Sequence, residues 1–443
     1  MKKKPPEVGA FEGFKVKIFN ELKLKIKDEK FITRSRLSGN SFTRDRSLPF
    51  HILIWFILQK SNQALQVCLD DFFDQLDLVT LTKSAFTQAR ANLCPKVFKS
   101  INTLIVNQFY ANTHFKKWKG FRVLAMDGST AKLPGNHSSL KNFFSRHGFG
   151  PKADVKHWMS RVSFLYDVFN GIVIDAQMAS FNTGEGALAN RHMAYVKKGD
   201  LLIFDRGYAS SQRMFQLMAK GAHFLFRMKD NWWKCVEEFQ KNGQTDQIVT
   251  LTLAKKYHYL LKKHPHLTAQ IQIRLIKKTN RKGESQVFAT SLTDTKIYSR
   301  KSILNLYKQR WAIEEAYKMI KSRMELIKFS GITSWAIQQD FYAKTVLISL
   351  NNALTFDIKP AKPKKQPIKR AKQKRNPIIN RTYAMHLLKK LIINVASGRG
   401  NVAQIMMENF NKIRKKVEYS RADQYFKRIV KPDTKYAGNY RSV

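Results

Sequence analysis

The sequence predicts a mixed α/β domain with helical regions before and after it in the chain. Between residues 120 and 230, short apolar runs of strand type alternate with amphipathic helical patterns, and residues 231–295 add further strand-like runs. Helical periodicity dominates 45–110 and returns at 335–355 and 380–417. A chain of 443 residues, 43% of them hydrophobic, can bury a large core and is expected to form two to four domains.

The N-terminal region is predicted to contain several short helices. Pro49 suits the first turn of one of them. Farther along, Thr82 or Ser84 can cap a helix that carries Gln88 and Arg90. A polar, basic helix at the end of such a series is typical of DNA-reading domains, but an ordinary helical bundle accounts for the pattern equally well.

Two apolar runs of the α/β region end on a carboxylate. Residues 122–127 (RVLAMD) and 201–205 (LLIFD) have the pattern of buried strands. Between them, strand-like runs at 161–169 and 172–179 are separated by an Asn-Gly pair, which favours a hairpin turn. A hairpin followed by alternating helix and strand predicts a layered domain with a mixed sheet. The remaining elements expected here are helices at 185–198 and 212–219 and a strand at 222–227.

The next segment is expected to be a mostly β insertion. It is rich in Lys, and strand-like runs occur at 248–253, 269–277 and 285–290, with a turn at 280–283. Residues 301–329 then have the periodicity of one long helix.

The charge of the chain points to a polyanionic partner. It has 80 Lys and Arg residues against 32 Asp and Glu, a formal net charge of +48. Because such an excess repels itself and serves no small-metabolite enzyme, nucleic acid is the expected partner and an anionic membrane surface the second choice. Residues 351–443 hold 23 basic and 5 acidic residues. Within them, 359–375 has nine basic residues and three prolines, and we expect a basic linker that contacts phosphates or is only a tether.

Other classes of protein are disfavoured. The three cysteines, Cys68, Cys94 and Cys235, are scattered, so neither a structural zinc site nor a disulfide framework is expected. The basic start is not followed by the apolar segment of a signal peptide, and the longest apolar run, 52–58, is too short to cross a bilayer. We therefore expect a soluble protein of a reducing compartment.

Asp127 and Asp205 are the first candidate functional residues. Each ends an apolar run and is followed by turn residues. Functional groups gather at the carboxyl ends of strands in α/β sheets, so the two carboxylates converge if their strands are neighbours. Close carboxylates repel one another, and a divalent cation such as Mg²⁺ or Mn²⁺ relieves the repulsion. The alternative is that each Asp only caps the following turn.

The segment YKQRWAIEEAYKMIK at 307–321 provides the second set. On a helix, Tyr307, Arg310, Glu314 and Lys321 fall within about 60° of one face. Arg and Lys suit phosphate oxygens, and Tyr can bond to or stack on a nucleotide. The alternative is a solvated face with an i,i+4 ion pair between Arg310 and Glu314. The opposite, buried stripe would comprise Leu306, Ile313, Ala316 and Ile320.

These motifs resemble the DDE transposases of bacterial insertion sequences, of the IS-four type. The signature of that family is Y-x2-R-x3-E-x6-K, and the four residues of the polar face match it without a gap. Trp311 and the IEE at 313–315 are also similar to the family, and LAMDGS and LIFDRGY resemble the surroundings of its two catalytic aspartates. The resemblance covers about residues 120–330, close at the three motifs and loose between them.

The resemblance implies a fold and a division into domains. The fold is an α/β RNase H-like catalytic core interrupted by a mostly β insertion, with helical N-terminal and C-terminal regions. The domains would be a helical DNA-binding region at 1–118, the first part of the core at 119–228, the insertion at 229–295, the second part with the catalytic Glu helix at 296–350, and a basic linker with a helical C-terminal region at 351–443.

The resemblance also implies roles for individual residues. The catalytic carboxylates, which would be ligands of two Mg²⁺ ions with Mn²⁺ as a substitute, are Asp127, Asp205 and Glu314. The residues that would bind DNA, through the phosphates of the transposon end, are Tyr307, Arg310 and Lys321. Where the second strand is cut through a hairpin, a flipped base would stack on Trp232 or Trp233, although burial in the insertion is the commoner role for either ring.

The implied function is DNA transposition. The enzyme would cut an insertion sequence at its ends and join the 3′ ends to target DNA by two-metal phosphoryl transfer. Its partner would be double-stranded DNA, held by a homodimer in the synaptic complex, in the bacterial cytoplasm at the nucleoid. The alternative is a non-enzymatic, sequence-specific DNA-binding protein, which has no need of three carboxylates. A simple metal nuclease would leave the Tyr-Arg-Lys face and the insertion unexplained.

Overall fold

The chain divides into two compact units, which are described one at a time. The helical unit comprises Met1–His114, Ala131–Ser160 and Ile320–Val443, and the sheet unit comprises Phe115–Thr130 and Arg161–Met319. The computed structural model describes residues 10–43, 48–60, 63–134, 138–142, 145–147, 157–229, 233–279, 283–322, 329–361 and 377–419.

The helical unit has the helices that the sequence predicts at 45–110, 335–355 and 380–417. Its α-helices are α1 (Ala10–Lys27), α2 (Glu29–Ser35), α3 (Phe50–Gln59), α4 (Leu65–Leu76), α5 (Lys83–Ala91), α6 (Lys96–Asn112), α13 (Ser334–Thr355), α14 (Arg381–Ser397) and α15 (Val402–Lys415). Its smaller elements are the 3₁₀ helix η1 (Ser138–Asn142), strand β2 (Ser145–His147) and an antiparallel pair, β10 (Pro377–Ile379) and β11 (Val417–Tyr419).

Side-chain caps explain where some of these helices begin. Asp28 accepts a hydrogen bond from the Phe31 N–H (3.0 Å) at the start of α2. Thr82 accepts one from the Ala85 N–H (3.2 Å) at the start of α5. Of the two caps that the sequence allowed for this helix, Thr82 rather than Ser84 is therefore the one used.

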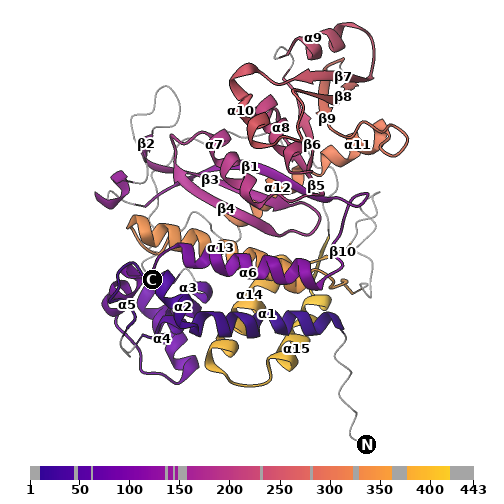
Figure 1. Ribbon diagram of the computed structural model, residues 1–443. Helices are drawn as coiled ribbons and strands as arrows, with labels where there is room; N and C mark the ends of the chain where they lie inside the picture. The colour runs from indigo at the N-terminus through magenta and orange to yellow at the C-terminus, as the bar shows by residue number, and fades with distance from the viewer. Residues whose placement is uncertain are drawn as a thin grey trace, which may run out of the picture. The chain divides into compact units, whose positions relative to one another are not determined.

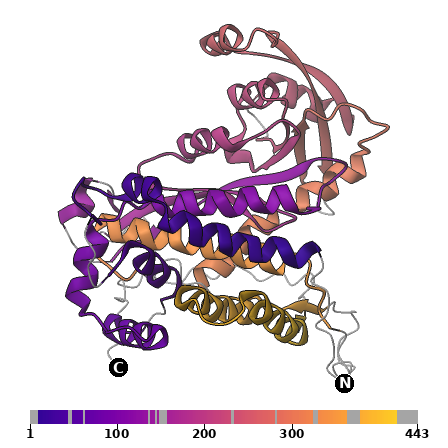
Figure 2. The same ribbon diagram turned by 60° about the horizontal axis from the view of Figure 1, so that its bottom comes forward.

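Helix α13 lies in the middle of the helical unit. It runs alongside α6, and α1 lies on the other side of α6 (Figures 1 and 2). Nearly all of its side chains are buried, including several polar ones. A helix that is buried on all sides must satisfy its polar groups within the protein, because an unpaired buried polar group is costly.

Arg90 donates hydrogen bonds to several of these buried polar groups. Its guanidinium donates to the carboxylate of Asp340 (2.7 Å), the amide oxygen of Gln339 (2.6 Å) and the hydroxyl of Ser330 (2.7 Å). Burial alone would raise the pKa of Asp340, but Arg90 and Lys60 outweigh it and hold that pKa well below its ordinary value. Arg90, a basic residue of the helix that the sequence offered for DNA reading, thus has its side chain buried and bonded within the protein core.

The sheet unit is a mixed α/β structure, as the sequence predicts. Its strands are β1 (Arg122–Lys132), β3 (His157–Asp167), β4 (Val173–Ser180), β5 (Asp200–Phe204), β6 (His223–Arg227), β7 (Asp246–Thr252), β8 (Gln270–Thr279) and β9 (Ser285–Thr290). Its α-helices are α7 (Glu185–His192), α8 (Ser211–Ala219), α9 (Lys234–Lys241), α10 (Tyr259–Lys263), α11 (Arg300–Lys308) and α12 (Trp311–Ser322). Its 3₁₀ helices are η2 (Met193–Tyr195), η3 (Arg206–Tyr208) and η4 (Lys255–Tyr257).

One sheet contains all of these strands. Their order is β3-β1-β5-β6-β9-β8-β7, and β4 pairs with β3; β2 of the helical unit pairs with residues 157–159 of β3, which belong to the same unit. β1, β5 and β6 are parallel neighbours, whereas β9, β8 and β7 continue the sheet in antiparallel fashion. The strands of the segment expected to be an insertion therefore extend the edge of the same sheet (Figure 1).

A buried apolar cluster holds the parallel strands and their antiparallel extension together. Its members come from β1, β5, β6, β8, β9 and α11, and they are Val123, Leu201, Ile203, Leu225, Ile276, Phe288, Leu292, Ile303 and Leu306. Because alternate side chains of a strand point to opposite faces of the sheet, this cluster fixes which face of each strand is inward. The hairpin expected at Asn170-Gly171 is present between β3 and β4, with Gly171 at a φ of +75°.

Among the described residues, no helix combines the length and the apolar character needed to cross a lipid bilayer.

Candidate active site

Asp127 and Asp205 lie on neighbouring parallel strands. The pairing of β1 with β5 begins with Arg122 opposite Asp200, a difference of 78 in residue number. Asp127 and Asp205 are separated by the same difference, since each lies five residues after one member of the starting pair. The two aspartates therefore reach the same edge of the sheet from adjacent strands.

The strand that carries Asp127 is longer than predicted. The sequence suggested that it ends at Asp127, but β1 continues to Lys132. It pairs with β5 as far as Ala125, opposite Ile203, and β3 lies on its other side in the sheet. Asp205, in contrast, directly follows the last residue of β5 and begins the 3₁₀ helix η3.

A buried ion pair joins the opposite ends of these two strands. Arg122 donates from Nε and Nη2 to the two carboxylate oxygens of Asp200, each at 2.7 Å. The residues are 8% and 2% exposed, so the pair is bidentate and almost dry. Asp200 also accepts from the N–H of Lys197 (2.8 Å). The pair fixes the register that brings Asp127 level with Asp205.

The helix that carries Glu314 is not continuous with the one that carries Tyr307. α11 ends at Lys308 and α12 begins at Trp311, so the prediction of one helix over 301–329 is wrong. The residues between them form i to i−3 hydrogen bonds, including Arg310 N–H to Tyr307 C=O at 3.0 Å. A turn wound this tightly has three residues rather than 3.6, which still leaves side chains at i and i+3 on one side.

Contacts among these side chains bring the motif residues together. The Tyr307 hydroxyl donates to Asp205 Oδ1 at 3.4 Å, and its ring packs edge-on against Phe288. Arg310 donates from Nη2 to Glu314 Oε1 at 2.6 Å, with side chains only 14% and 22% exposed. Arg227 Nη1 lies 3.9 Å from Asp205 Oδ1. The i,i+4 ion pair considered from the sequence is thus formed, but it is largely buried.

Asp127 titrates abnormally in this surrounding. The pKa of its carboxyl is raised to about 6, mainly by burial and in smaller part by the charges of Glu314 and Glu185. The N–H of Gly128, which bonds to its Oδ1 at 2.9 Å, and the guanidinium of Arg310 oppose the shift. The charges of Glu314 and Glu185 thus both act on Asp127, and a cation bound at Asp127 would relieve that repulsion.

The fit of this site to a metal ion is incomplete. Its candidate ligands are all carboxylate oxygens, which suit Mg²⁺ and Mn²⁺. Within the described part of the chain, however, no three acidic, His or Cys side chains are gathered closely enough to hold a metal ion. The guanidinium of Arg310 lies on Glu314, where a cation would otherwise bind.

Glu185 is a site neighbour that the sequence did not reveal. It lies in the first turn of α7, and Arg161 holds its carboxylate at 3.0 Å. A Cβ built at Gly128 would approach Glu185 Cδ to 2.9 Å, so Glu185 lies directly over the backbone next to Asp127. Its sequence context, TGEGA, carries no motif, and only the sheet topology brings it to this place.

Two of the candidates named from the sequence cannot be placed at the site. Lys321 lies on α12, but its side chain is outside the described residues, as is all of Trp232. Trp233 is half-buried at the start of α9, next to the buried helix residues Val236 and Phe239.

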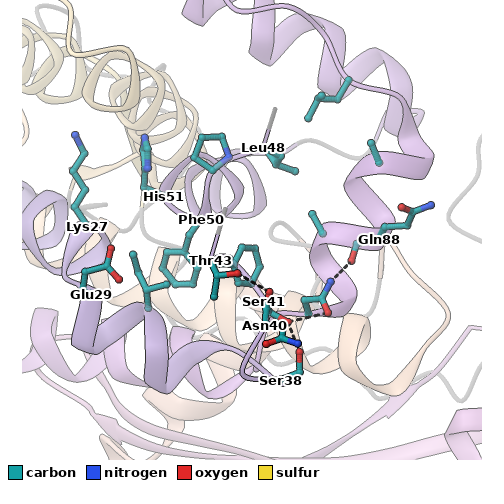
Figure 3. A pocket seen from close by; sticks show the side chains of 17 residues that line it. Lys27, Glu29, Ser38, Asn40, Ser41, Thr43, Leu48, Phe50, His51 and Gln88 are labelled. Carbon is teal, nitrogen blue, oxygen red and sulfur yellow. Dashed lines mark hydrogen bonds between the residues drawn. The ribbon is translucent and has the colours of Figure 1, made fainter. Parts of the chain in front are cut away.

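A separate cavity of about 760 Å³ lies within the helical unit. Figure 3 shows Lys27 and Glu29 on one side of it and Gln88 on the other, with Asn40 between them. Its lining mixes apolar and polar side chains, and the titratable groups among them are Lys27, Glu29 and His51. The carboxylates of the sheet unit, rather than this cavity, therefore form the candidate active site.

Comparison with known proteins places this geometry in a family. The family model described as "Transposase DDE domain" matches residues 118–351, which is more than half of the chain and includes Asp127, Asp205 and Glu314.

Individual relatives agree with that match. The transposase InsG of insertion sequence element IS4 from Escherichia coli is 24% identical over 297 residues, covering 65% of each chain. The transposase of insertion sequence element IS231B from Bacillus thuringiensis is 20% identical over 292 residues, covering 56% of this chain and 58% of the relative. The chain thus spans less than two thirds of the length of these relatives.

A solved piggyBac transposase synaptic complex with hairpin DNA superposes with a TM-score of 0.44 at 12% identity, covering 91% of this chain and 82% of the other. The family model and the relatives, taken with the Y-x2-R-x3-E-x6-K signature, give one conclusion: the chain belongs to the DDE transposase family of bacterial insertion sequences, of the IS4 type.

Proposed function

We propose that this protein is a DNA transposase that cuts an insertion sequence at its ends and joins the 3′ ends to target DNA. One observation carries the proposal beyond family membership. Asp127 and Asp205 are level on adjacent parallel strands, and the charge of Glu314, which is paired with Arg310, acts on Asp127. Together with the mixed sheet, this arrangement supports an RNase H-like core that carries the β insertion at 229–295.

Asp127, Asp205 and Glu314 would hold the divalent cations of the reaction, two Mg²⁺ ions or Mn²⁺ in their place. Such ions would supply activation of a water or a 3′-hydroxyl and stabilisation of the leaving oxygen. The chain itself supplies the ligands and their spacing. The Tyr307 hydroxyl and Arg227 hold Asp205 in place from the neighbouring α11 and β6.

Arg310 would bind a phosphate of the transposon end, assisted by Tyr307 and Lys321. Its guanidinium now bonds to Glu314, and an incoming phosphate offers it a second anionic partner of suitable planar geometry. When Arg310 turns to the phosphate, Glu314 loses its partner and becomes available to a cation. DNA binding and completion of the cation site are in this way one event.

The partner would be double-stranded DNA, bound by a homodimer in the synaptic complex at the bacterial nucleoid. The net charge of +48 supports contact with many phosphates, which need not depend on sequence. The basic segment at 359–375, of which residues 359–361 are described, would add to this contact.

A second candidate function is sequence-specific DNA binding without catalysis. It is favoured by the lack, among the residues that the structure describes, of three acidic side chains gathered as one metal site. It is disfavoured by the presence of all three carboxylates in the sequence, since binding alone needs none of them.

Cleavage of DNA that carries the element's own terminal repeats separates the two functions. We expect strand cutting that depends on Mg²⁺ or Mn²⁺, and its loss in Asp205→Asn and Glu314→Gln with end binding retained. Glu315→Gln is the matched control, because Glu315 is the next residue of α12 and its carboxylate accepts a hydrogen bond from Trp311 Nε1 (2.9 Å). Unchanged cutting by Glu314→Gln would disprove the catalytic assignment, and end binding without any cutting by the wild type would favour the second candidate.

A further inference from the structure

The chain makes a compact excursion between β7 and β8, at residues 254–268. The N–H of Leu253 donates to the carbonyl of Ala269 at 2.8 Å and so closes the two ends of the excursion. It contains η4 and α10, and it is anchored from within by the side chain of Leu260, which is buried. Loops whose ends lie close together and whose own side chains pack inside them hold a definite shape and are frequently functional.

Two side-chain contacts fasten the excursion to α8. Gln212, in the first turn of α8, donates from Nε2 to the Tyr259 hydroxyl at 2.7 Å. At the other end of the helix, His266 Nε2 lies 3.1 Å from the carbonyl of Ala219. The excursion therefore runs along α8, and Figure 1 shows α10 beside that helix. Since α8 begins six residues after Asp205, the Tyr259 end is the one nearer in the chain to the candidate active site.

The excursion carries positive charge and no negative charge. Residues 254–268 contain four lysines and three histidines but neither Asp nor Glu. The lysines, all of them exposed, are Lys255, Lys256, Lys262 and Lys263. In the part of the chain that the structure describes, none of the four forms an ion pair with an acidic side chain. Their charges are thus directed at the solvent and are not neutralised by these neighbours.

The combined effect of the cations is felt at His264, which directly follows α10. Partial burial lowers the pKa of His264, and the charges of His266, Lys263 and Lys220 act in the same direction. Lys220 belongs to the end of α8, so cations from two elements meet at this point. A surface that disfavours an added proton in this way attracts an anion.

The residue types of the excursion suit the backbone of DNA and not its bases. Lysine contacts a phosphate as a point charge on a flexible stem, without the planar, two-pronged geometry by which Arg recognises its partners. Such contacts act by releasing counterions and do not depend on sequence. They suit the target duplex, because the element's own ends must be told apart from all other DNA. The alternative is a solvated surface that binds nothing.

We propose that residues 254–268 form a docking surface for the backbone of the target duplex, with Lys262 and Lys263 of α10 as its principal contacts. This rests on the proposed function, because only an enzyme that joins DNA to DNA has a target. None of these residues belongs to the Tyr307–Lys321 motif, which we assign to the transposon end.

Binding of a random-sequence duplex without terminal repeats tests the proposal. The affinity of the full-length protein is measured by fluorescence anisotropy over a range of salt concentrations. Lys262→Gln/Lys263→Gln should reduce the slope of log affinity against log salt by about two, since each phosphate contact accounts for about 0.9. Lys255→Gln/Lys256→Gln is the second variant and should act in the same direction. Joining of cut ends to this duplex should fall as well.

The matched control is Lys234→Gln/Lys241→Gln on α9. Both lysines are exposed residues of the same insertion, and Lys234 lies 3.8 Å from Glu238. Because the control removes the same net charge, the total charge of the protein cannot account for a difference between the variants. The control should keep the wild-type slope. Thermal unfolding checks that each variant remains folded.

The outcomes separate this proposal from the proposed function. A wild-type slope in both test variants, with ends cut and joined normally, would overturn the docking surface and leave the transposase assignment intact. An equal change of slope in the control would also overturn it, since the effect would then be one of general charge. Weaker binding of terminal-repeat DNA alone would overturn the assignment to the target. A wild-type protein that binds the random duplex through these lysines but never cuts its ends would overturn the proposed function, and the target role with it.

Discussion

Replacement of Asp200 by Ala should weaken both the stability of the sheet unit and the alignment of its site. Asp200 receives two hydrogen bonds from Arg122, each of 2.7 Å, in a place where the two residues are 2% and 8% exposed. The change leaves a buried guanidinium without its counter-charge and far from water. An unpaired buried charge lowers the free energy of unfolding much more than the loss of an ion pair at the surface does.

The expected loss follows from that difference. Removal of one partner of a buried pair typically costs about 3–5 kcal/mol, whereas an exposed pair contributes about 0–1 kcal/mol. A domain typically has a free energy of unfolding of about 5–15 kcal/mol, so most domains would remain folded after a loss of this size, with much less stability. The double variant Arg122→Met/Asp200→Leu removes both charges and should recover most of the loss.

Hydrogen exchange in the segments 123–125 and 201–203 is the suitable measurement, because it reports on these strands and not on the helical unit. Asp246→Ala is the matched control, since Arg274 grips Asp246 through two bonds of 2.5 and 2.6 Å on β7 and β8 of the same sheet. Both single variants should lose stability, but only Asp200→Ala should also lose cleavage at temperatures where it remains folded. A loss below about 1 kcal/mol in Asp200→Ala would refute the reasoning, since the pair would then behave as a surface pair. Equal loss of cleavage in the control would refute the link to the site.

Three further predictions concern other parts of the molecule. The pKa of Asp340 is lowered in the folded protein, so its carboxylate stabilises the fold above pH about 4, the pKa of Asp in the unfolded chain, and this stability is lost as the pH falls below that pKa. The acid unfolding of Asp340→Asn should therefore depend less steeply on pH, and an unchanged slope would contradict this. Gly128→Ala should cost only about 0.5–1.5 kcal/mol in urea unfolding, because its Cβ would lie 2.9 Å from Glu185 Cδ, at the end of a side chain that can shift to another rotamer, and a loss that persists after Glu185→Ala would contradict this. Arg310→Ala should weaken binding of transposon ends and reduce the dependence of log affinity on log salt by about one, whereas an unchanged slope would show that Arg310 contacts no phosphate.

Local signals in the sequence predicted much of the fold correctly. Thr82 caps its helix through its own side chain, and the Asn170-Gly171 turn depends on backbone angles that few residues adopt. The apolar runs before Asp127 and Asp205 mark buried strands because only a strand covered on both faces is apolar throughout. Each of these signals is confined to a few neighbouring residues, which is why a single sequence reveals it.

Contacts between distant segments were not predictable in the same way. Arg90 is a basic residue of the kind that contacts DNA, yet it is buried and forms an ion pair with Asp340, 250 positions later in the chain. Nothing local in Tyr317 indicates that its hydroxyl lies against the Asp127 backbone, 190 positions away. The break between α11 and α12 also escapes helical periodicity, because a turn of three residues leaves the polar face nearly in line.

The equal spacing from Arg122 to Asp127 and from Asp200 to Asp205 has a consequence for how this region can change over time. Substitutions within either five-residue stretch alter only packing, and many of moderate size should be tolerated. The loss or gain of a single residue is different, since it moves one aspartate to the opposite face of the sheet while the ion pair keeps the strands in place. The site therefore depends on the number of residues from Arg122 to Asp127 and from Asp200 to Asp205 more than on the identity of the residues between them. An insertion or deletion in one strand would need an equal one in its neighbour.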